Sequence, residues 1–100
     1  MSFSISIVAG AKADIRRLKA AHRSLVLDAI KRHPGDHPNV EEGDKKILRG
    51  LRPPWATTRP VWQVTVVPFR VFYDVDEERD EVIVNAVRKK PQGKTTEKIL

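Results

Sequence analysis

The stretch of sequence that decides the fold of this chain is WQVTVVPFRVFYDVD, residues 62–76. Apolar side chains alternate with other side chains on both sides of Pro68, which predicts two antiparallel strands joined by a tight turn at the proline. The second strand carries Arg70 inside an apolar run. Because an unpaired guanidinium is costly to desolvate, we expect Arg70 either to pair with an acid or to line a surface that meets an anion.

The sequence on either side of this hairpin predicts the remaining elements. Residues 76–80 form a polar turn and residues 81–89 a third strand, which completes a meander. At the other end of the chain, Phe3, Ile5 and Ile7 alternate with serines and predict a strand that ends at Ala9-Gly10.

Helical spacing of apolar residues predicts two helices, over about residues 12–23 and 24–33. We expect the break near Arg23, with Ser24 as N-cap of the second helix, and Pro34-Gly35 as its end. The predicted fold class is therefore α+β: an N-terminal strand, an α-helical hairpin and a three-stranded antiparallel meander that forms a small twisted sheet. The helical hairpin packs on one face of the sheet, which leaves a concave basic face that holds Arg70.

The length and composition limit the functions that the chain can have. One hundred residues make a single domain, 1–100, with a long basic loop at 34–60 and a basic C-terminal tail at 91–100. A net charge of +6 attracts nucleic acid, anionic lipid or an acidic protein partner. The absence of cysteine excludes disulfides and thiolate metal sites. No signal-peptide pattern and no run of ~20 apolar residues occurs, so we expect a soluble, cytoplasmic protein that does not bind membranes.

Neither a metal nor a cofactor is expected. His33 and His37 are separated by Pro34-Gly35 and so do not share a helical face. The acidic residues at 74–80 lack the glycine and the terminal glutamate of a calcium loop.

The order strand, two helices, basic loop and three strands resembles the RelE/ParE superfamily of type II toxin–antitoxin toxins, over about residues 3–90. The resemblance is carried by FRVFYDVD at 69–76, by VIVNAVRKK at 82–90 and by KKILRGL at 45–51, which is similar to the K-x-L-x-G region of the family. It implies a RelE/ParE-like fold and an antitoxin partner that wraps around the toxin. RelE-like members enter the ribosome and cleave messenger RNA, whereas ParE-like members inhibit DNA gyrase.

The resemblance also implies a set of site residues. The proposed catalytic residues of a RelE-like endoribonuclease are Arg70 and Lys90. The residues expected to bind RNA are Lys45, Lys46, Arg49, Arg52, Arg88 and Lys89. Simpler roles are open for each group: an Arg70–Asp74 pair that holds the hairpin, a solvated basic strand end, and solubilising charges on the loop.

Side chains that could move protons are few. The tail after Pro91 has no tyrosine or histidine, unlike active RelE relatives, and this departure favours the alternatives without nuclease activity. Tyr73 has the inward parity of a core residue, and His22 is expected to be a half-buried spacer. Trp55 could stack on a base, close the core or contact an antitoxin. The leading prediction is a toxin that binds RNA at the ribosome and cleaves messenger RNA; the alternatives are a ParE-like gyrase inhibitor and a non-catalytic antitoxin-binding module.

Overall fold

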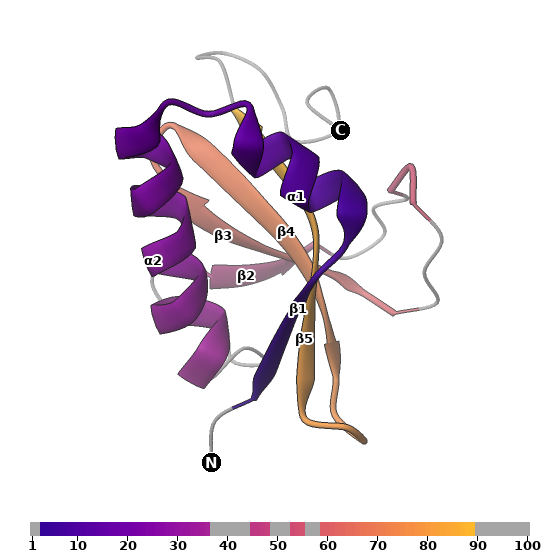
Figure 1. The fold of residues 1–100 in the computed structure, drawn as a ribbon. Coiled ribbons are helices and arrows are strands. Elements are labelled where there is room, and N and C mark those ends of the chain that lie inside the picture. Colours follow the sequence, from indigo (N-terminus) through magenta and orange to yellow (C-terminus); the bar gives the residue numbers. More distant parts are fainter. Residues whose placement is uncertain (1–2, 37–44, 49–52, 56–58, 90–100) are drawn as a thin grey trace.

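The stretch at residues 62–76 forms the centre of a five-stranded sheet (Figure 1). A computed structural model of the chain describes residues 3–36, 45–48, 53–55 and 59–89, and of residues 33–36 and 45 it describes the backbone alone. The strands are β1 (Ser4–Ile7), β2 (Lys45–Leu48), β3 (Val61–Val66), β4 (Phe69–Asp76) and β5 (Glu81–Lys89). Their order in the sheet is β1-β5-β4-β3-β2, in which β1 is parallel to β5 and all other neighbours are antiparallel.

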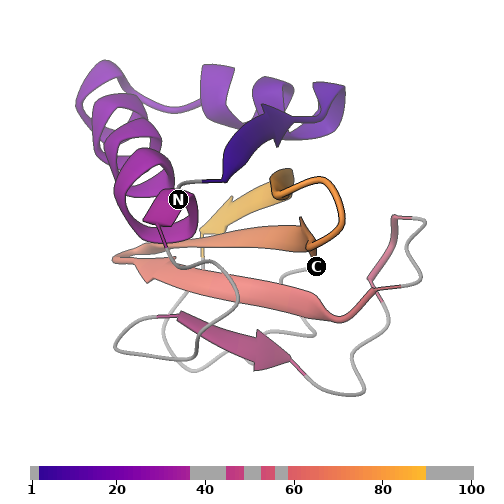
Figure 2. The same ribbon diagram turned by 90° about the horizontal axis from the view of Figure 1, so that it is seen from below.

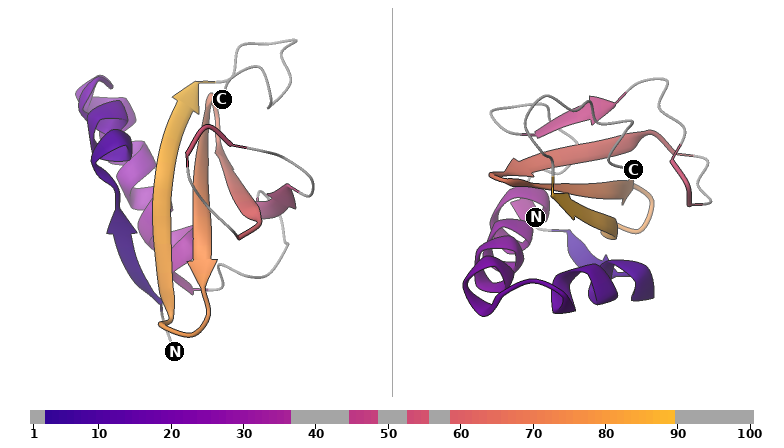
Figure 3. Two further views of the ribbon diagram at one scale, coloured as in Figure 1. Left: turned by 90° about the vertical axis from the view of Figure 1, so that its right-hand side faces the viewer. Right: turned by 90° about the horizontal axis from the view of Figure 1, so that it is seen from above.

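Two helices, α1 (Ala9–Arg16) and α2 (Ala20–Asp36), follow β1. Both lie on the same side of the twisted sheet (Figures 2 and 3). α1 packs along β5, and α2 packs against β1, β3 and β4. The predicted α+β class, the helical hairpin and the antiparallel meander are thus confirmed.

The sheet has two strands more than the predicted meander. One is the N-terminal strand, which joins the meander through β5. The other is β2, within the predicted loop at 34–60, where Ile47 pairs with Trp62 of β3. A run of only four residues gives too little alternation to be told from a loop, and the pairing with β3 decides the outcome.

The helix boundaries predicted from the sequence are wrong. The break lies at residues 17–19 rather than near Ser24, and Ser24 is an exposed residue within α2. Arg23 explains the position of the break, because its Nη2 donates to the carbonyl oxygens of Leu18 at 3.0 Å and Arg16 at 3.3 Å. These bonds satisfy carbonyl groups that the end of α1 would leave unpaired. α2 also continues beyond Pro34-Gly35 to Asp36, so Pro34 does not end the helix as predicted, although its missing N–H removes one helical hydrogen bond.

Burial divides the apolar residues between the two faces of the sheet. The larger core lies between the helices and the sheet, and its fully buried members include Ala11, Val26, Val64, Val71, Tyr73, Val82 and Val84. A smaller cluster of Val61, Phe72 and Ala86 lies on the other face, with Leu48 and Trp55 packed against it. In the described part of the chain, neither helix is long and apolar enough to cross a membrane.

A register shift in the β4–β5 ladder decides which way the last strand faces. Tyr73 pairs with Val84 but Phe72 pairs with Ala86, so Asn85 is an extra residue in β5. Such a bulge inverts the alternation beyond it. Val82 and Val84 face the helices before the bulge and Val87 faces them after it, which turns Arg88 to the opposite face.

Candidate functional site

Two arginines lie opposite each other on the face of the sheet that the helices do not cover. Arg70 of β4 and Arg88 of β5 are direct partners in the antiparallel ladder. Direct partners project to the same face, with Cα atoms about 4.5–5.5 Å apart. That face is the one of the smaller cluster, since Arg70 and Phe72 are two positions apart on β4, as are Ala86 and Arg88 on β5. Both side chains therefore leave the backbone on the same face, at the margin of this cluster.

The two guanidinium groups are held in the same way by the backbone. The Nη1 of Arg70 donates to the carbonyl oxygen of Phe69, and the Nη1 of Arg88 donates to that of Val87, both at 3.2 Å. Both side chains are partly buried. Each arginine thus keeps its Nε–Nη2 edge for another acceptor, and this edge matches the two oxygens of a phosphate.

Only one of the two arginines has an acidic partner. Among the described residues, Arg70 makes no ion pair, so the Arg70–Asp74 pair considered from the sequence does not form; Asp74 is buried, with 4% of its surface exposed. Arg88 instead forms an ion pair with Asp14 of α1. The sequence prediction missed Asp14, because it lies 74 positions from Arg88 and only the packing of α1 along β5 joins them.

The other cations expected at the site are only partly described. Lys46 and Lys89 are exposed. Lys46 pairs with Gln63 of β3, and Thr65, two positions further along β3, pairs with Arg70. Lys46 therefore projects to the same face as Arg70. Lys45 begins β2, where the backbone alone is described. The predictions for Arg49, Arg52 and Lys90 fall outside the described residues.

The face that carries the arginines is less open than the sequence predicted. Its centre is apolar, and Trp55 lies over Phe72 with ring centroids 6.2 Å apart. Of the three roles considered for Trp55, the structure therefore shows the closing of a core. Phe72 is fully buried and Gln63 is 2% exposed. Among the residues that the structure describes, basic side chains are thus found at the margin of this face and not across a wide concave surface.

Among the described side chains, the tyrosine and the histidine that could act as acid or base lie on the helix side of the sheet. Tyr73 is fully buried in the larger core and stacks on Trp62, as its parity predicted. Burial raises the pKa of the Tyr73 phenol far above its ordinary value, so it does not ionise near neutral pH. The half-buried His22 packs edge-on against Phe69, with ring centroids 5.2 Å apart, which fits its predicted role as a half-buried spacer. Among the described residues, neither a tyrosine nor a histidine accompanies Arg70 and Arg88.

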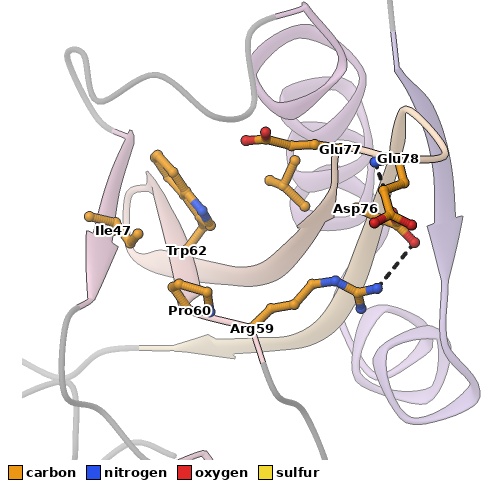
Figure 4. Close-up of a pocket in the computed structure, with 8 residues that line it drawn as sticks. Ile47, Arg59, Pro60, Trp62, Asp76, Glu77 and Glu78 are labelled. Atoms are coloured by element: carbon orange, nitrogen blue, oxygen red, sulfur yellow. Dashed lines mark hydrogen bonds and ion pairs between the residues drawn. The ribbon is translucent and has the colours of Figure 1, made fainter.

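A pocket of about 500 Å³ lies at the opposite end of β4 (Figure 4). Ile47 and Trp62 line its apolar part, while Glu77 and Glu78 supply negative charge. Asp76 forms an ion pair with Arg59 at 3.1 Å. Its Oδ1 accepts hydrogen bonds from the backbone N–H groups of Glu78 and Arg79, which makes Asp76 a turn residue. The pocket is unsuited to a phosphate. No group of three or more potential metal ligands occurs in the described part of the chain.

Comparison with known proteins was made on sequence and on structure. No protein-family model matches the sequence, and no curated protein is similar to it in sequence. Solved structures of RelE proteins share the fold. A chain of the RelBE2 toxin–antitoxin complex from Mycobacterium tuberculosis has a TM-score of 0.70 at 17% identity, covering 90% of this chain and all of that one.

Two further structures agree with this result. A chain of the archaeal RelE–RelB complex from Pyrococcus horikoshii has a TM-score of 0.64 at 21% identity, over 95% of this chain and 100% of that one. The isolated RelE toxin of Escherichia coli gives 0.61 at 17% identity, over 92% of this chain and 88% of that one. The resemblance expected from the sequence is confirmed at the level of the fold.

Proposed function

We propose that this chain, which has the fold of the RelE toxins, is the toxin of a type II toxin–antitoxin system that binds RNA at the ribosome and cleaves messenger RNA. The observation that carries the proposal is the pair of arginines, Arg70 opposite Arg88, on the face that the helices leave uncovered. The agreement of structures over at least 90% of the chain supports the toxin assignment.

The chemistry of such a cleavage fits the arginine pair. Attack of a 2′-hydroxyl on the adjacent phosphate builds negative charge on the phosphoryl oxygens and requires the transfer of two protons. Arg70, which has no acidic partner among the described residues, is suited to stabilise that charge. Arg88 and exposed Lys89 and Lys46 would hold the flanking backbone, with Lys45, Arg49, Arg52 and Lys90 as further candidates.

A second candidate function needs no proton transfer. The placement of Tyr73 and His22 on the helix side of the sheet favours a chain that acts by binding alone. It would then be a ParE-like inhibitor of DNA gyrase or a non-catalytic, antitoxin-binding module. For either function we place the protein in the cytoplasm, where ribosomes and gyrase are found.

Induced expression in a bacterial host separates these candidates. We expect translation to stop within minutes and messenger RNA to be cut at ribosomes, with DNA supercoiling unchanged. A change in supercoiling with intact messenger RNA would contradict the nuclease proposal and support gyrase inhibition. If neither readout changes, the chain is a non-catalytic module.

The proposed partner is a cognate antitoxin with acidic and apolar side chains along an extended or helical segment. A net charge of +6 favours such a partner through long-range attraction. Co-expression with the product of the adjacent gene should therefore give a stable complex whose affinity falls as salt rises. Host cells that grow normally while producing the active, unpartnered protein would contradict this part of the proposal.

A further inference from the structure

The outer edge of β5 is completed by a side chain where β1 ends. β1 pairs with the first half of β5, up to Ile7 opposite Val84, and the N–H of Val8 then donates to the carbonyl of Val84 at 3.1 Å. β5 continues to Lys89 with α1 beside it instead of a strand. At this edge the N–H of Val87 donates to the Oδ2 of Asp14 at 3.1 Å. The carboxylate thus takes the place of a strand carbonyl.

The same carboxylate oxygen also holds Arg88. The Nη1 of Arg88 donates to Oδ2 of Asp14, and only 14% of the Asp14 side chain and 33% of the Arg88 side chain are exposed. A charge pair that is so far desolvated is held more firmly than one on the surface. Arg17 lies 3.7 Å from the other oxygen of Asp14, but with 79% of its side chain exposed it contributes little.

These contacts leave one edge of the Arg88 guanidinium for a ligand. Nη1 donates both to Asp14 and to the carbonyl of Val87. In the part of the chain that the structure describes, Nε and Nη2 of Arg88 make no hydrogen bond. The side chain is therefore fixed at one nitrogen and presents the Nε–Nη2 edge, the geometry that binds an oxyanion with two parallel bonds.

We propose that Asp14 is a positioning residue that fixes Arg88 at the outer edge of β5, so that the Nε–Nη2 edge of its guanidinium group binds a phosphate of the RNA backbone. The inference rests on the proposed function for the identity of the anion. Its physical basis is that a side chain already held in its binding geometry loses less conformational entropy when it binds. Without the carboxylate, only the carbonyl oxygen of Val87 would hold Arg88 at this edge.

The test compares two substitutions that change the net charge equally. Asp14→Asn keeps an oxygen that can accept the Val87 N–H but removes the charge that holds Arg88. Asp28→Asn is the matched control, since Asp28 pairs with Arg32 on α2 at 3.0 Å with both side chains 63% exposed. The probe is a short single-stranded RNA oligonucleotide at fixed salt, with folding checked by circular dichroism.

We expect Asp14→Asn to lower RNA affinity about tenfold, and Asp28→Asn to raise it slightly because one negative charge is lost. In an Arg88→Gln background, Asp14→Asn should have no such effect. A folded Asp14→Asn protein whose affinity rises like that of the control would overturn the inference.

Two further measurements keep the outcomes separate. If the wild type binds no RNA, the proposed function fails, and inorganic pyrophosphate replaces RNA as the probe; binding of neither anion overturns the inference as well. If Asp14→Asn does not fold, NMR of the wild type decides. The Nε–H of Arg88 should then be more ordered than that of Arg79, an exposed arginine at the hairpin turn, and equal mobility would overturn the inference.

Discussion

Arg70 and Arg88 are direct partners in the β4–β5 ladder, and of the two only Arg88 is paired with a carboxylate in the described structure. Like charges placed directly opposite on a sheet are destabilising. Asp14 offsets this repulsion for Arg88, whereas Arg70 has only the carbonyl oxygen of Phe69. An anion bound at Arg70 would supply the charge partner that Arg70 lacks among the described residues, which makes Arg70 the most informative residue to change.

Replacement of Arg70 by alanine should reduce messenger RNA cleavage by roughly 10²-fold, the scale expected when one donor to a transition state is removed. Arg70→Lys should restore only part of the activity, because an ammonium group cannot form two parallel bonds to a phosphate. The measurement is single-turnover cleavage on programmed ribosomes.

Arg79→Ala is the matched control, because Arg79 is exposed at the far end of the same hairpin; it should leave the rate unchanged. Unfolding of the Arg70→Ala protein would show that Arg70 is a structural residue. Equal rates for Arg70→Ala and the control would exclude a role for Arg70 in the chemistry.

The loop cations offer a test of RNA binding that does not depend on cleavage. Each contact between a cation and a single-stranded phosphate backbone contributes about 0.7 to the slope of log affinity against log salt. Joint replacement of four cations by glutamine should therefore flatten this slope. The four are Lys45, Lys46, Arg49 and Arg52. The slope is measured by titrating an RNA oligonucleotide at several salt concentrations.

The control for that experiment neutralises four cations on the helices. All are exposed on α1, on α2 or between them: Lys12, Arg16, Lys19 and Lys31. These substitutions should lower affinity through net charge alone and change the slope much less. If both variants have the slope of the wild type, the loop cations serve solubility only.

The burial of Tyr73 predicts a loss of stability at alkaline pH. Burial raises its pKa in the folded state, while the unfolded state ionises near the ordinary value of about 10. Above about pH 10 the folded state therefore holds a proton that the unfolded state releases. The contribution of Tyr73 to the free energy of unfolding is complete below about pH 10 and decreases as pH rises above it.

The chain contains a single tyrosine, so its ultraviolet tyrosinate absorbance reports on this group alone. The absorbance should rise only together with unfolding, and Tyr73→Phe should reduce the loss of stability above pH 10. A tyrosinate signal that appears near pH 10 in the folded protein would show that Tyr73 is accessible to solvent.

Arg23 should contribute to stability through the end of α1. Arg23→Ala leaves the carbonyl groups of Leu18 and Arg16 without this donor, and we expect the free energy of unfolding to fall by roughly 1–3 kcal/mol. Arg32→Ala removes only an exposed pair with Asp28 and should cost about 0.3–0.5 kcal/mol. Urea denaturation measures both, and equal losses would show that the contacts of Arg23 contribute little.

Alternation and helical spacing were sufficient to predict the class of the fold. The strands on both sides of Pro68 and the inward position of Tyr73 follow from a period of two, which does not depend on distant residues. The helix boundaries did not follow, because the apolar spacing continues across residues 17–19. The contacts of Arg23 with two carbonyl groups decide that the chain breaks there.

The sequence by itself determined that Arg70 lies in an apolar strand and projects away from the helices. It could not determine what lies beside Arg70. Strict alternation from Val82 and Val84 would turn Arg88 toward the helices, and only the bulge at Asn85 brings it to the face of Arg70. Asp14 reaches Arg88 because α1 takes the place of a strand at the edge of β5. A register shift and a helix docked at a sheet edge depend on packing between segments far apart in the chain, and local periodicity contains no record of either.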